Sequence, residues 1–347
     1  MKSKILENDI NEIASCFSLL SELKGTSILV TGSTGLIGSI VVKTFLKYGN
    51  IKVYAACRNE KKFQSIFSEY LCDNLIPIFS DITTISISKI DLDYIIHTAS
   101  ITDSQTFVKA PVQTLNTAID GTRNLLEQCI NKKLKCFLYL SSLEVYGSFE
   151  NDEIKNIKEN EYGYIDPLSV RSSYSEGKRI VENYCISYMN QYGIPVKISR
   201  LCQTFGPGVE YNDNRVFAQF ARSVIEGKDI VLKTRGETVR NYCYTTDAVA
   251  GIITIMTQGQ AGQAYNIANM TTTISIADMA KLVCKLYPDS KSKVVFDIAP
   301  DATKLGYNPI MKIQINSSKL QALGWEPKVS LKEMYKRLIQ YMKVINA

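Results

Sequence analysis

Three glycines at three-residue spacing lie between an apolar strand pattern and a helical pattern near the start of the chain. Residues 26–31, TSILVT, have the character of a buried strand, and the helical pattern continues to about Tyr48. The loop between them, residues 32–38, reads GSTGLIG. Glycines let a backbone turn tightly and approach a pyrophosphate, and the following helix N-terminus offers unpaired N–H groups. This order predicts a dinucleotide site, and a glycine-rich turn without a ligand is the alternative.

Short apolar runs alternate with helical patterns along the first part of the chain. Further strands are expected at residues 52–57, 76–79, 94–97, 136–140, 196–199 and 264–268, and long helices at 112–130 and 171–192. This alternation predicts an α/β fold with a Rossmann-type, doubly wound parallel sheet. The pattern breaks up after residue 208, which predicts a smaller C-terminal substrate-binding lobe. The expected parts are a helical extension (1–24), the dinucleotide-binding domain (25–202 plus about 236–270) and the nucleotide-sugar-binding lobe (203–235 and 271–347).

Composition excludes several classes of protein. Of the 347 residues 45% are hydrophobic, and no apolar run approaches the ~20 residues of a membrane span. The first 20 residues read as an amphipathic helix and not as a signal peptide, which predicts a cytoplasmic protein. The nine cysteines are scattered singly and the chain has one histidine, so neither a disulfide framework nor a metal site is expected. The net charge of +6 is spread along the chain, which suits an anionic small molecule better than a nucleic acid.

The end of the second expected strand bears on the choice of dinucleotide. An acidic residue at this point accepts hydrogen bonds from the ribose of NAD, whereas an arginine suits the 2′-phosphate of NADP. The strand ends Cys57-Arg58-Asn59 and has no acid. Arg58 therefore permits NADP, and a solvated loop arginine is the alternative. Asp81 and Ile82 follow the third strand, where such folds contact the adenine.

A tyrosine and a lysine four residues apart indicate proton-transfer chemistry. Tyr174 and Lys178 fall on one face of the expected helix. A phenol has a pKa near 10, and a neighbouring ammonium, together with the positive nicotinamide ring, lowers it toward that of a useful base. Most such pairs are surface or packing pairs. The glycine loop, together with the hydroxyls of Ser141 and Ser142, favours a catalytic pair here.

Several segments together resemble the extended short-chain dehydrogenases/reductases that modify nucleotide sugars. These are TGSTGLIG, DYIIHTAS, TLNTAIDGTRNLLE, SSLEVYG, YSEGK, RLCQTFGP and RNYCYTTDAV, and the resemblance covers residues 25 to about 340. It implies that Tyr174 is the base, that Lys178 lowers its pKa and holds the nicotinamide ribose, and that Ser142 completes the triad. It also implies a homodimer, formed through a four-helix bundle of the two long helices. The implied NAD or NADP contacts are Gly32, Thr34, Gly35, Leu36, Ile37, Gly38, Arg58, Asp81, Ile82, Thr98, Ala99, Ser100, Tyr174 and Lys178.

Glu144 separates the subgroups of this family. A glutamate at this point resembles the 4,6-dehydratases and the UDP-glucuronate decarboxylases, and the segments VRSSYSEGKRIVENYC and NDNRVFAQF favour the decarboxylases. That resemblance implies catalytic roles for Glu144 and Arg240, and substrate contacts by Gln203, Arg215 and Arg240. The chain departs from the decarboxylase pattern at Leu143, Gln203, Gly208 and Arg58.

Three other interpretations stay open. One is that the chain is a 4,6-dehydratase, a 4-epimerase or a 4-ketosugar reductase acting on a related nucleotide sugar. Another is that Glu144 only pairs with a core arginine. A non-catalytic dinucleotide sensor on the same fold is a further alternative, disfavoured because Tyr174 and Lys178 are both present. His97 is expected to be a packed core histidine.

Overall fold

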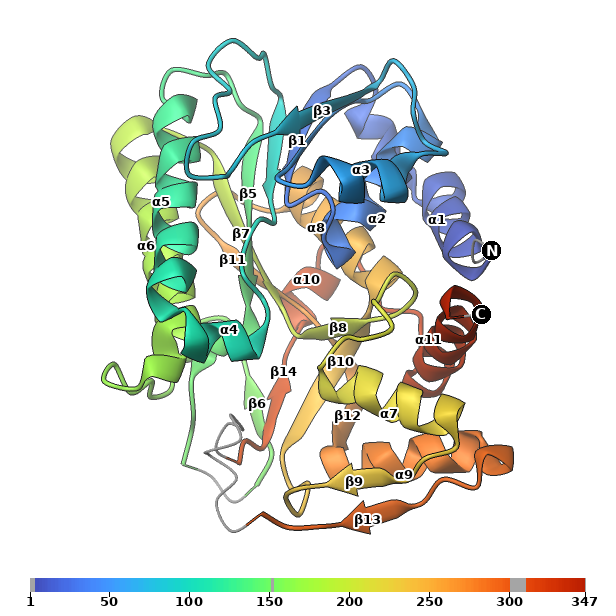
Figure 1. The fold of residues 1–347 in the computed structure, drawn as a ribbon. Helices are drawn as coiled ribbons and strands as arrows, with labels where there is room; N and C mark the ends of the chain where they lie inside the picture. Colours follow the sequence, from blue (N-terminus) through green and yellow to red (C-terminus); the bar gives the residue numbers. More distant parts are fainter. Residues whose placement is uncertain (1–3, 151–152, 300–309, 347) are drawn as a thin grey trace.

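Within residues 4–150, 153–299 and 310–346, which the computed structural model describes, seven parallel strands form the central sheet (Figure 1). They are β1 (Ser27–Thr31), β2 (Lys52–Cys57), β3 (Leu75–Phe79), β4 (Tyr94–His97), β5 (Cys136–Ser142), β7 (Val196–Leu201) and β11 (Ala264–Ile267). Their order across the sheet is β11–β7–β5–β4–β1–β2–β3. The chain runs outward from β1 to β3 and then reverses through β4, so β1 and β4 flank a topological switch point. The predicted Rossmann-type sheet is confirmed.

Helices cover both faces of this sheet. The helices α5 (Pro111–Cys129) and α6 (Ser173–Tyr192) pack against each other on one face, and α4 (Ser104–Lys109) lies at their end (Figure 1). The other face is covered by α2 (Leu36–Tyr48) and α8 (Thr245–Gln258), and α3 (Glu60–Phe67) adds to the same core. Side chains of β1 alternate between the faces: Leu29 packs on the α5 side, and Ile28 and Val30 pack on the α2 side. Burial of each such side chain contributes roughly 1.5–3 kcal/mol.

Two helix boundaries differ slightly from the sequence-based expectation. The helix expected at 171–192 begins at Ser173, because Val170–Ser172 forms a separate 3₁₀ turn. A 3₁₀ turn is a common way to enter an α-helix. The helix expected at 112–130 begins one residue earlier, with Pro111 in its first turn, where the missing N–H of proline has no cost. Tyr174 and Lys178 remain one turn apart on α6.

The N-terminal segment forms α1 (Lys4–Cys16) and a 3₁₀ helix, Ser18–Leu23. Helix α1 packs on α2 and α8 and also reaches α11 (Leu331–Ile345) near the C-terminus (Figure 1). Asp9 on α1 is buried and accepts hydrogen bonds from the Tyr244 hydroxyl and from Arg337 Nη1, the latter at 2.8 Å. The extension therefore joins the large lobe to the smaller one.

The smaller lobe is built on a second sheet with the order β12–β10–β8. Helices pack on it and enclose a separate apolar core that includes Phe205 and Tyr335. Its strands are β8 (Gln203–Phe205), β9 (Ile230–Leu232), β10 (Val239–Tyr244), β12 (Asn269–Ser275) and β13 (Val294–Phe296). Its helices are α7 (Val216–Glu226), α9 (Ile276–Leu286) and α11, with a 3₁₀ turn at Pro288–Ser290.

Two segments cross the expected lobe boundaries. β10 falls inside the range 236–270 expected in the dinucleotide-binding domain, yet it pairs with β8 and β12. Conversely, β14 (Ile313–Ile315) pairs with β6 (Lys155–Ile157), and α10 (Ser318–Gln321) packs on β11. The reason is apolar burial, because Ile313, Ile315 and Trp325 join the core of the large lobe. The range 271–347 therefore contributes to both lobes. None of the helices in the described parts of the chain has the length and apolar character needed to cross a membrane.

Candidate active site

A cavity of about 1390 Å³ lies at the carboxyl ends of the central strands and is lined by residues of both lobes. Parallel α/β sheets bind their ligands at this edge, near the topological switch point. Every residue that the sequence singled out for the site lines this cavity: Gly32, Thr34, Gly35, Leu36, Ile37, Gly38, Arg58, Asp81, Ile82, Thr98, Ala99, Ser100, Ser142, Glu144, Tyr174, Lys178, Gln203, Arg215 and Arg240.

The glycine loop leaves its backbone open to a ligand. Gly32 has φ +63°, and a Cβ there would lie 2.7 Å from Thr98 Oγ1. A Cβ on Gly38 would lie 2.4 Å from the Gly32 carbonyl oxygen, so the third glycine lets α2 approach the loop. Gly35 precedes the first turn of α2, and no side chain of the described residues caps it. The N–H groups at this helix N-terminus, with the bare loop, fit the pyrophosphate of a dinucleotide.

His97 supports this loop from behind. It is 1% exposed, with Nδ1 2.8 Å from Thr31 Oγ1 and Nε2 2.9 Å from Thr122 Oγ1. Burial lowers the pKa of His97 to about 3, so its ring is neutral at physiological pH. The expected packed core histidine is confirmed, and it ties β4 to β1 and α5.

Tyr174 and Lys178 lie on the cavity wall formed by α6. Lys178 Nζ donates to the Leu140 carbonyl at 2.7 Å and lies 5.7 Å from the centre of the Tyr174 ring. Burial lowers the pKa of Lys178 to about 8. Burial also raises the pKa of Tyr174 to about 12, and a hydrogen bond with Ser142 and the charges of Arg171 and Arg215 oppose this shift. The phenol pKa is thus above its ordinary value in the protein alone, and its lowering by Lys178 together with a bound nicotinamide stays a prediction.

Glu144 lies just after the carboxyl end of β5, in a short 3₁₀ helix, Leu143–Tyr146. Ser142 Oγ accepts a hydrogen bond from the Glu144 backbone N–H at 3.2 Å and so caps this turn. The carboxylate accepts from Arg171 Nη2 at 3.0 Å and from Ser175 Oγ at 3.0 Å. The pairing with an arginine is thus present. Because Glu144 and Arg171 both line the cavity, the pair belongs to the site wall and not to the closed core.

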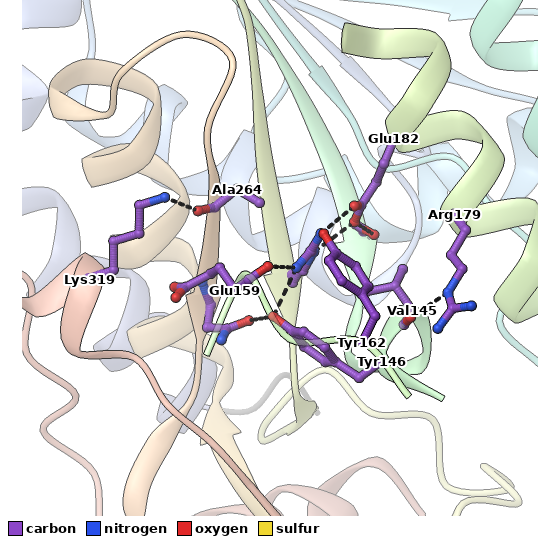
Figure 2. Close-up of polar contacts among 11 residues, drawn as sticks. Val145, Tyr146, Glu159, Tyr162, Arg179, Glu182, Ala264 and Lys319 are labelled. Atoms are coloured by element: carbon purple, nitrogen blue, oxygen red, sulfur yellow. Dashed lines mark hydrogen bonds and ion pairs between the residues drawn. The ribbon is translucent and has the colours of Figure 1, made fainter. Parts of the chain in front are cut away.

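A buried ion pair lies behind this wall (Figure 2). Arg200 on β7 donates from Nε and Nη2 to the two oxygens of Glu182 at 2.9 and 2.6 Å. Glu182 is one turn after Lys178 and also accepts from Ser141 Oγ at 2.5 Å. Arg200 further donates to the Tyr146 hydroxyl at 3.1 Å. This network joins β7 to β5 and α6, the two elements that carry the predicted triad residues.

The comparisons with known proteins agree with this geometry. A profile of the NAD dependent epimerase/dehydratase family matches residues 28–268. The chain belongs to this family. Among its relatives, the UDP-glucuronic acid decarboxylase 6 of Arabidopsis thaliana is 31% identical over 318 residues, covering 88% of this chain and 85% of the relative.

Two further comparisons extend this result. The UDP-glucuronic acid decarboxylase 1 of Xenopus tropicalis is 29% identical over 343 residues, covering 99% of this chain and 78% of the relative. Among solved structures, the UDP-glucuronic acid 4-epimerase from Bacillus cereus in complex with UDP-glucuronic acid and NAD is 25% identical, with a TM-score of 0.78. That alignment covers 92% of this chain and 99% of the epimerase chain.

In this epimerase/dehydratase-family chain, the part of the cavity at the ends of β2 and β3 carries Arg58 and Asp81. Their side chains are 3.7 Å apart and are 66% and 44% exposed. The Asp81 carboxylate also accepts from the Thr83 backbone N–H and hydroxyl, which hold the pKa of Asp81 below its usual range. Arg58 is the cation at the end of β2, and a ligand phosphate can reach it without breaking a buried contact.

Sequence reasoning missed four cavity residues of this family member. Phe107 stacks on Tyr174 with ring centres 4.3 Å apart, and Arg171 lies 4.9 Å from the Phe107 ring. Lys233 and Arg235 add positive charge on the wall of the smaller lobe. Arg171 could have been found, because it stands three residues before Tyr174 and so shares its helical face. Phe107 and the two lobe residues come from segments with no motif, and only the folded chain brings them here.

Proposed function

We propose that this chain is an NAD(P)-dependent enzyme that oxidises the C4 hydroxyl of a nucleotide sugar to a transient ketone. The reaction that we assign to it is the decarboxylation of UDP-glucuronate to UDP-xylose. The observation that carries the proposal is that Ser142, Glu144, Tyr174 and Lys178 line one cavity. The two relatives named UDP-glucuronic acid decarboxylases, which match over most of the chain, support the carboxylate-bearing sugar.

The chemistry begins when Tyr174 accepts the proton of the C4 hydroxyl as hydride leaves C4. A bound NAD(P)⁺ provides the hydride acceptor, and its positive ring favours the ionised phenol. The new ketone is β to the C6 carboxylate, so the electrons of the C5–C6 bond can pass toward the carbonyl as CO₂ leaves. Protonation at C5 and return of hydride to C4 complete UDP-xylose, whereas release before that return leaves a 4-keto pentose.

Each side chain at the reacting centre then has a distinct role. Ser142 hydrogen-bonds to the phenol, and Lys178, which lines the same cavity, is the proposed partner of the nicotinamide ribose. Glu144 handles the proton at C5, and Arg240 balances charge near C6. Gln203 and Arg215 are the proposed contacts of the nucleotide diphosphate, since both line the wall of the smaller lobe.

A second candidate reaction rests on the same carboxylate. In a 4,6-dehydratase, Glu144 would remove the C5 proton that the ketone acidifies, and water would leave from C6. The similarity to a UDP-glucuronic acid 4-epimerase gives weight to a 4-epimerase as well. A 4-ketosugar reductase draws support from Arg58, since it would consume NADPH.

The cofactor that we propose is NAD or NADP. NAD suits an enzyme that returns the hydride within one turnover. Arg58, exposed at the end of β2 where an acid would select NAD, permits the 2′-phosphate of NADP. The dinucleotide that co-purifies with the protein, identified by mass spectrometry, decides between them.

We further propose a homodimer that pairs α5 and α6 of two subunits in a four-helix bundle. Val112 on α5 is 68% exposed and Ile180 on α6 is 44% exposed, which leaves apolar surface on this helix pair. Sedimentation should give twice the chain mass of 38.9 kDa, and a species of 38.9 kDa alone would contradict the dimer. A cytoplasmic location is part of the same proposal.

The test of the proposed reaction is direct. The purified protein, with the dinucleotide it carries, is incubated with UDP-glucuronate, and CO₂ and UDP-xylose are followed by mass spectrometry. Formation of both supports the proposal. Turnover of a nucleotide hexose with a 6-hydroxymethyl group, without turnover of UDP-glucuronate, would overturn it in favour of the second candidate.

A further inference from the structure

The guanidinium of Arg171 has hydrogen-bond donors that the described residues do not use. Nη2 donates to the Glu144 oxygens at 3.0 and 3.3 Å. Nε is buried, and no acceptor among the described residues bonds to it. A guanidinium carries five N–H donors in a planar fork, so one carboxylate occupies only part of its capacity. Arg171 therefore retains capacity for a second anion.

Arg171 is also held in a defined place on the cavity wall. Its guanidinium carbon lies 4.9 Å from the centre of the Phe107 ring, and Phe107 in turn stacks on Tyr174. Glu144 fixes the other side through the ion pair, and both side chains are about one-fifth exposed, at 21% and 18%. Stacking and pairing limit the rotamers of Arg171, so binding a second anion would order little that is not already ordered.

Glu144 presents an electrostatic problem for the proposed substrate. A sugar carboxylate at C6 must enter the region of the Glu144 carboxylate, and like charges at close range in a partly buried site repel. A fixed arginine between the two carboxylates removes this repulsion, because one guanidinium can donate to both. A neutral 6-hydroxymethyl sugar gains much less from the same arginine.

We infer that Arg171 is the specificity residue for the sugar carboxylate. It binds the C6 carboxylate with the terminal Nη donors that Glu144 leaves unused, since Nε is buried, and it thereby selects a uronic acid over a neutral hexose. The inference rests on the proposed function. Because a salt-bridged carboxylate is stabilised in the ground state, Arg171 acts in recognition and not in breaking the C5–C6 bond. Its loss should therefore raise KM more than it lowers kcat.

Arg240 is the competing candidate for the same carboxylate. It projects from β10 in the smaller lobe, whereas Arg171 and Glu144 lie on the wall of the large lobe. The two assignments differ in a measurable way. If Arg171 binds the carboxylate, its partner Glu144 must compete with the ligand for it, and no such link to Glu144 is expected for Arg240.

The experiment measures binding of three ligands, UDP, UDP-glucose and UDP-glucuronate, by isothermal titration calorimetry. The protein carries its dinucleotide and the substitution Tyr174→Phe to prevent turnover. Arg171→Gln should lower the affinity for UDP-glucuronate by about tenfold or more, since a charge-assisted contact is lost. The affinities for UDP and UDP-glucose should change by less than about twofold. Glu144→Gln should raise the affinity for UDP-glucuronate a few-fold. Arg171→Lys, which keeps a positive charge, should lose less affinity than Arg171→Gln.

Arg179→Gln is the matched structural control. Arg179 is on α6, two turns after the 3₁₀ turn that carries Arg171. It donates to the Val145 carbonyl at 2.7 Å, next to Glu144 (Figure 2), but it does not line the cavity. A purely structural disturbance should weaken all three ligands alike, as expected for Arg179→Gln. The same pattern for Arg171→Gln would overturn the inference. So would selective loss of UDP-glucuronate binding in Arg240→Gln with none in Arg171→Gln.

Failure of the proposed function gives a different result. Absence of binding by all three ligands to the parent protein would refute a UDP-sugar substrate. Binding of UDP-glucose but not of UDP-glucuronate would refute the uronic acid and with it the role of Arg171. If the parent binds UDP-glucuronate and Arg171→Gln does not change its affinity, only the inference about Arg171 fails.

Discussion

The two halves of the cavity, which we propose bind the dinucleotide and the sugar, are shaped by different means. In the proposed dinucleotide half, residues 32, 34–38 and 98–100 line the wall, and the backbone packs closely because Gly32 and Gly38 have no Cβ. In the sugar half, Glu144, Arg171 and Tyr174 converge through hydrogen bonds and ring stacking. The first half depends on local backbone geometry, and the second on side chains from separate elements. A substitution in the first half should therefore act through a steric clash with the backbone. A substitution in the second half should act through loss of a hydrogen-bond, ion-pair or stacking partner.

The largest expected effect is in the sugar half. Tyr174→Phe keeps the ring that stacks on Phe107 but removes the hydroxyl that accepts the C4 proton. Turnover of UDP-glucuronate should fall by about 10²–10⁴-fold, the usual contribution of a general base. Steady-state kinetics measure the loss, and dinucleotide affinity should fall far less than turnover. Full turnover in this variant would contradict the role of Tyr174 as the base.

The next effect concerns the support of the sugar half. Glu182→Gln leaves Arg200, which is 2% exposed, without its charged partner. Removing one member of a buried ion pair destabilises a protein by about 3–5 kcal/mol, and urea unfolding should report that loss. The exposed pair Lys228–Glu226 provides the control, since Lys228→Gln should change the free energy of unfolding by less than about 1 kcal/mol. Equal effects of the two variants would refute the supporting role of the pair.

A smaller effect is expected from a collision in the dinucleotide half. The Cβ of Gly38→Ala would lie 2.4 Å from the Gly32 carbonyl oxygen, so α2 must shift away from the loop. Such overpacking costs about 1–3 kcal/mol, which, if it all falls on the bound state, corresponds to roughly fivefold to 150-fold weaker dinucleotide binding. Fluorescence titration measures the affinity. At Gly25, also at positive φ, a Cβ would meet nothing within 4 Å, so Gly25→Ala should leave the affinity unchanged.

The smallest effect is a pH dependence of the free energy of unfolding, caused by His97 behind the dinucleotide half. Burial lowers the pKa of His97 to about 3, so below pH 6.5 the unfolded chain binds a proton that the folded chain does not. His97 should therefore remove about 1 kcal/mol of stability as the pH falls from 6.5 to 5.5, with further loss toward pH 3. Urea unfolding at several pH values measures this slope. His97→Gln should be less stable at pH 7 but have a shallower slope, and an unchanged slope would contradict the assignment.

The same contrast explains what the sequence could predict. The glycine loop and the strands before and after it are local patterns, so the sheet, its cofactor loop and the position of Tyr174 relative to Lys178 follow from spacing. The lobe boundary does not, because Ile313, Ile315 and Trp325 return to the large core through long-range burial. The position of Phe107 beside Tyr174 could not be predicted either, because it depends on the packing of α4 against α6. The rise in the Tyr174 pKa on burial could not be predicted either, because it depends on how the folded chain packs around the side chain.

The central claim is that oxidation at C4 makes the C6 carboxylate leave as CO₂ from a sugar held beside Tyr174 and Glu144. Conversion of UDP-glucuronate in D₂O, analysed by NMR and mass spectrometry, tests it most directly. The account predicts UDP-xylose with one deuterium at C5 and none at C4, together with one CO₂ per product. A product that keeps all six sugar carbons, whether epimerised or dehydrated, would contradict it.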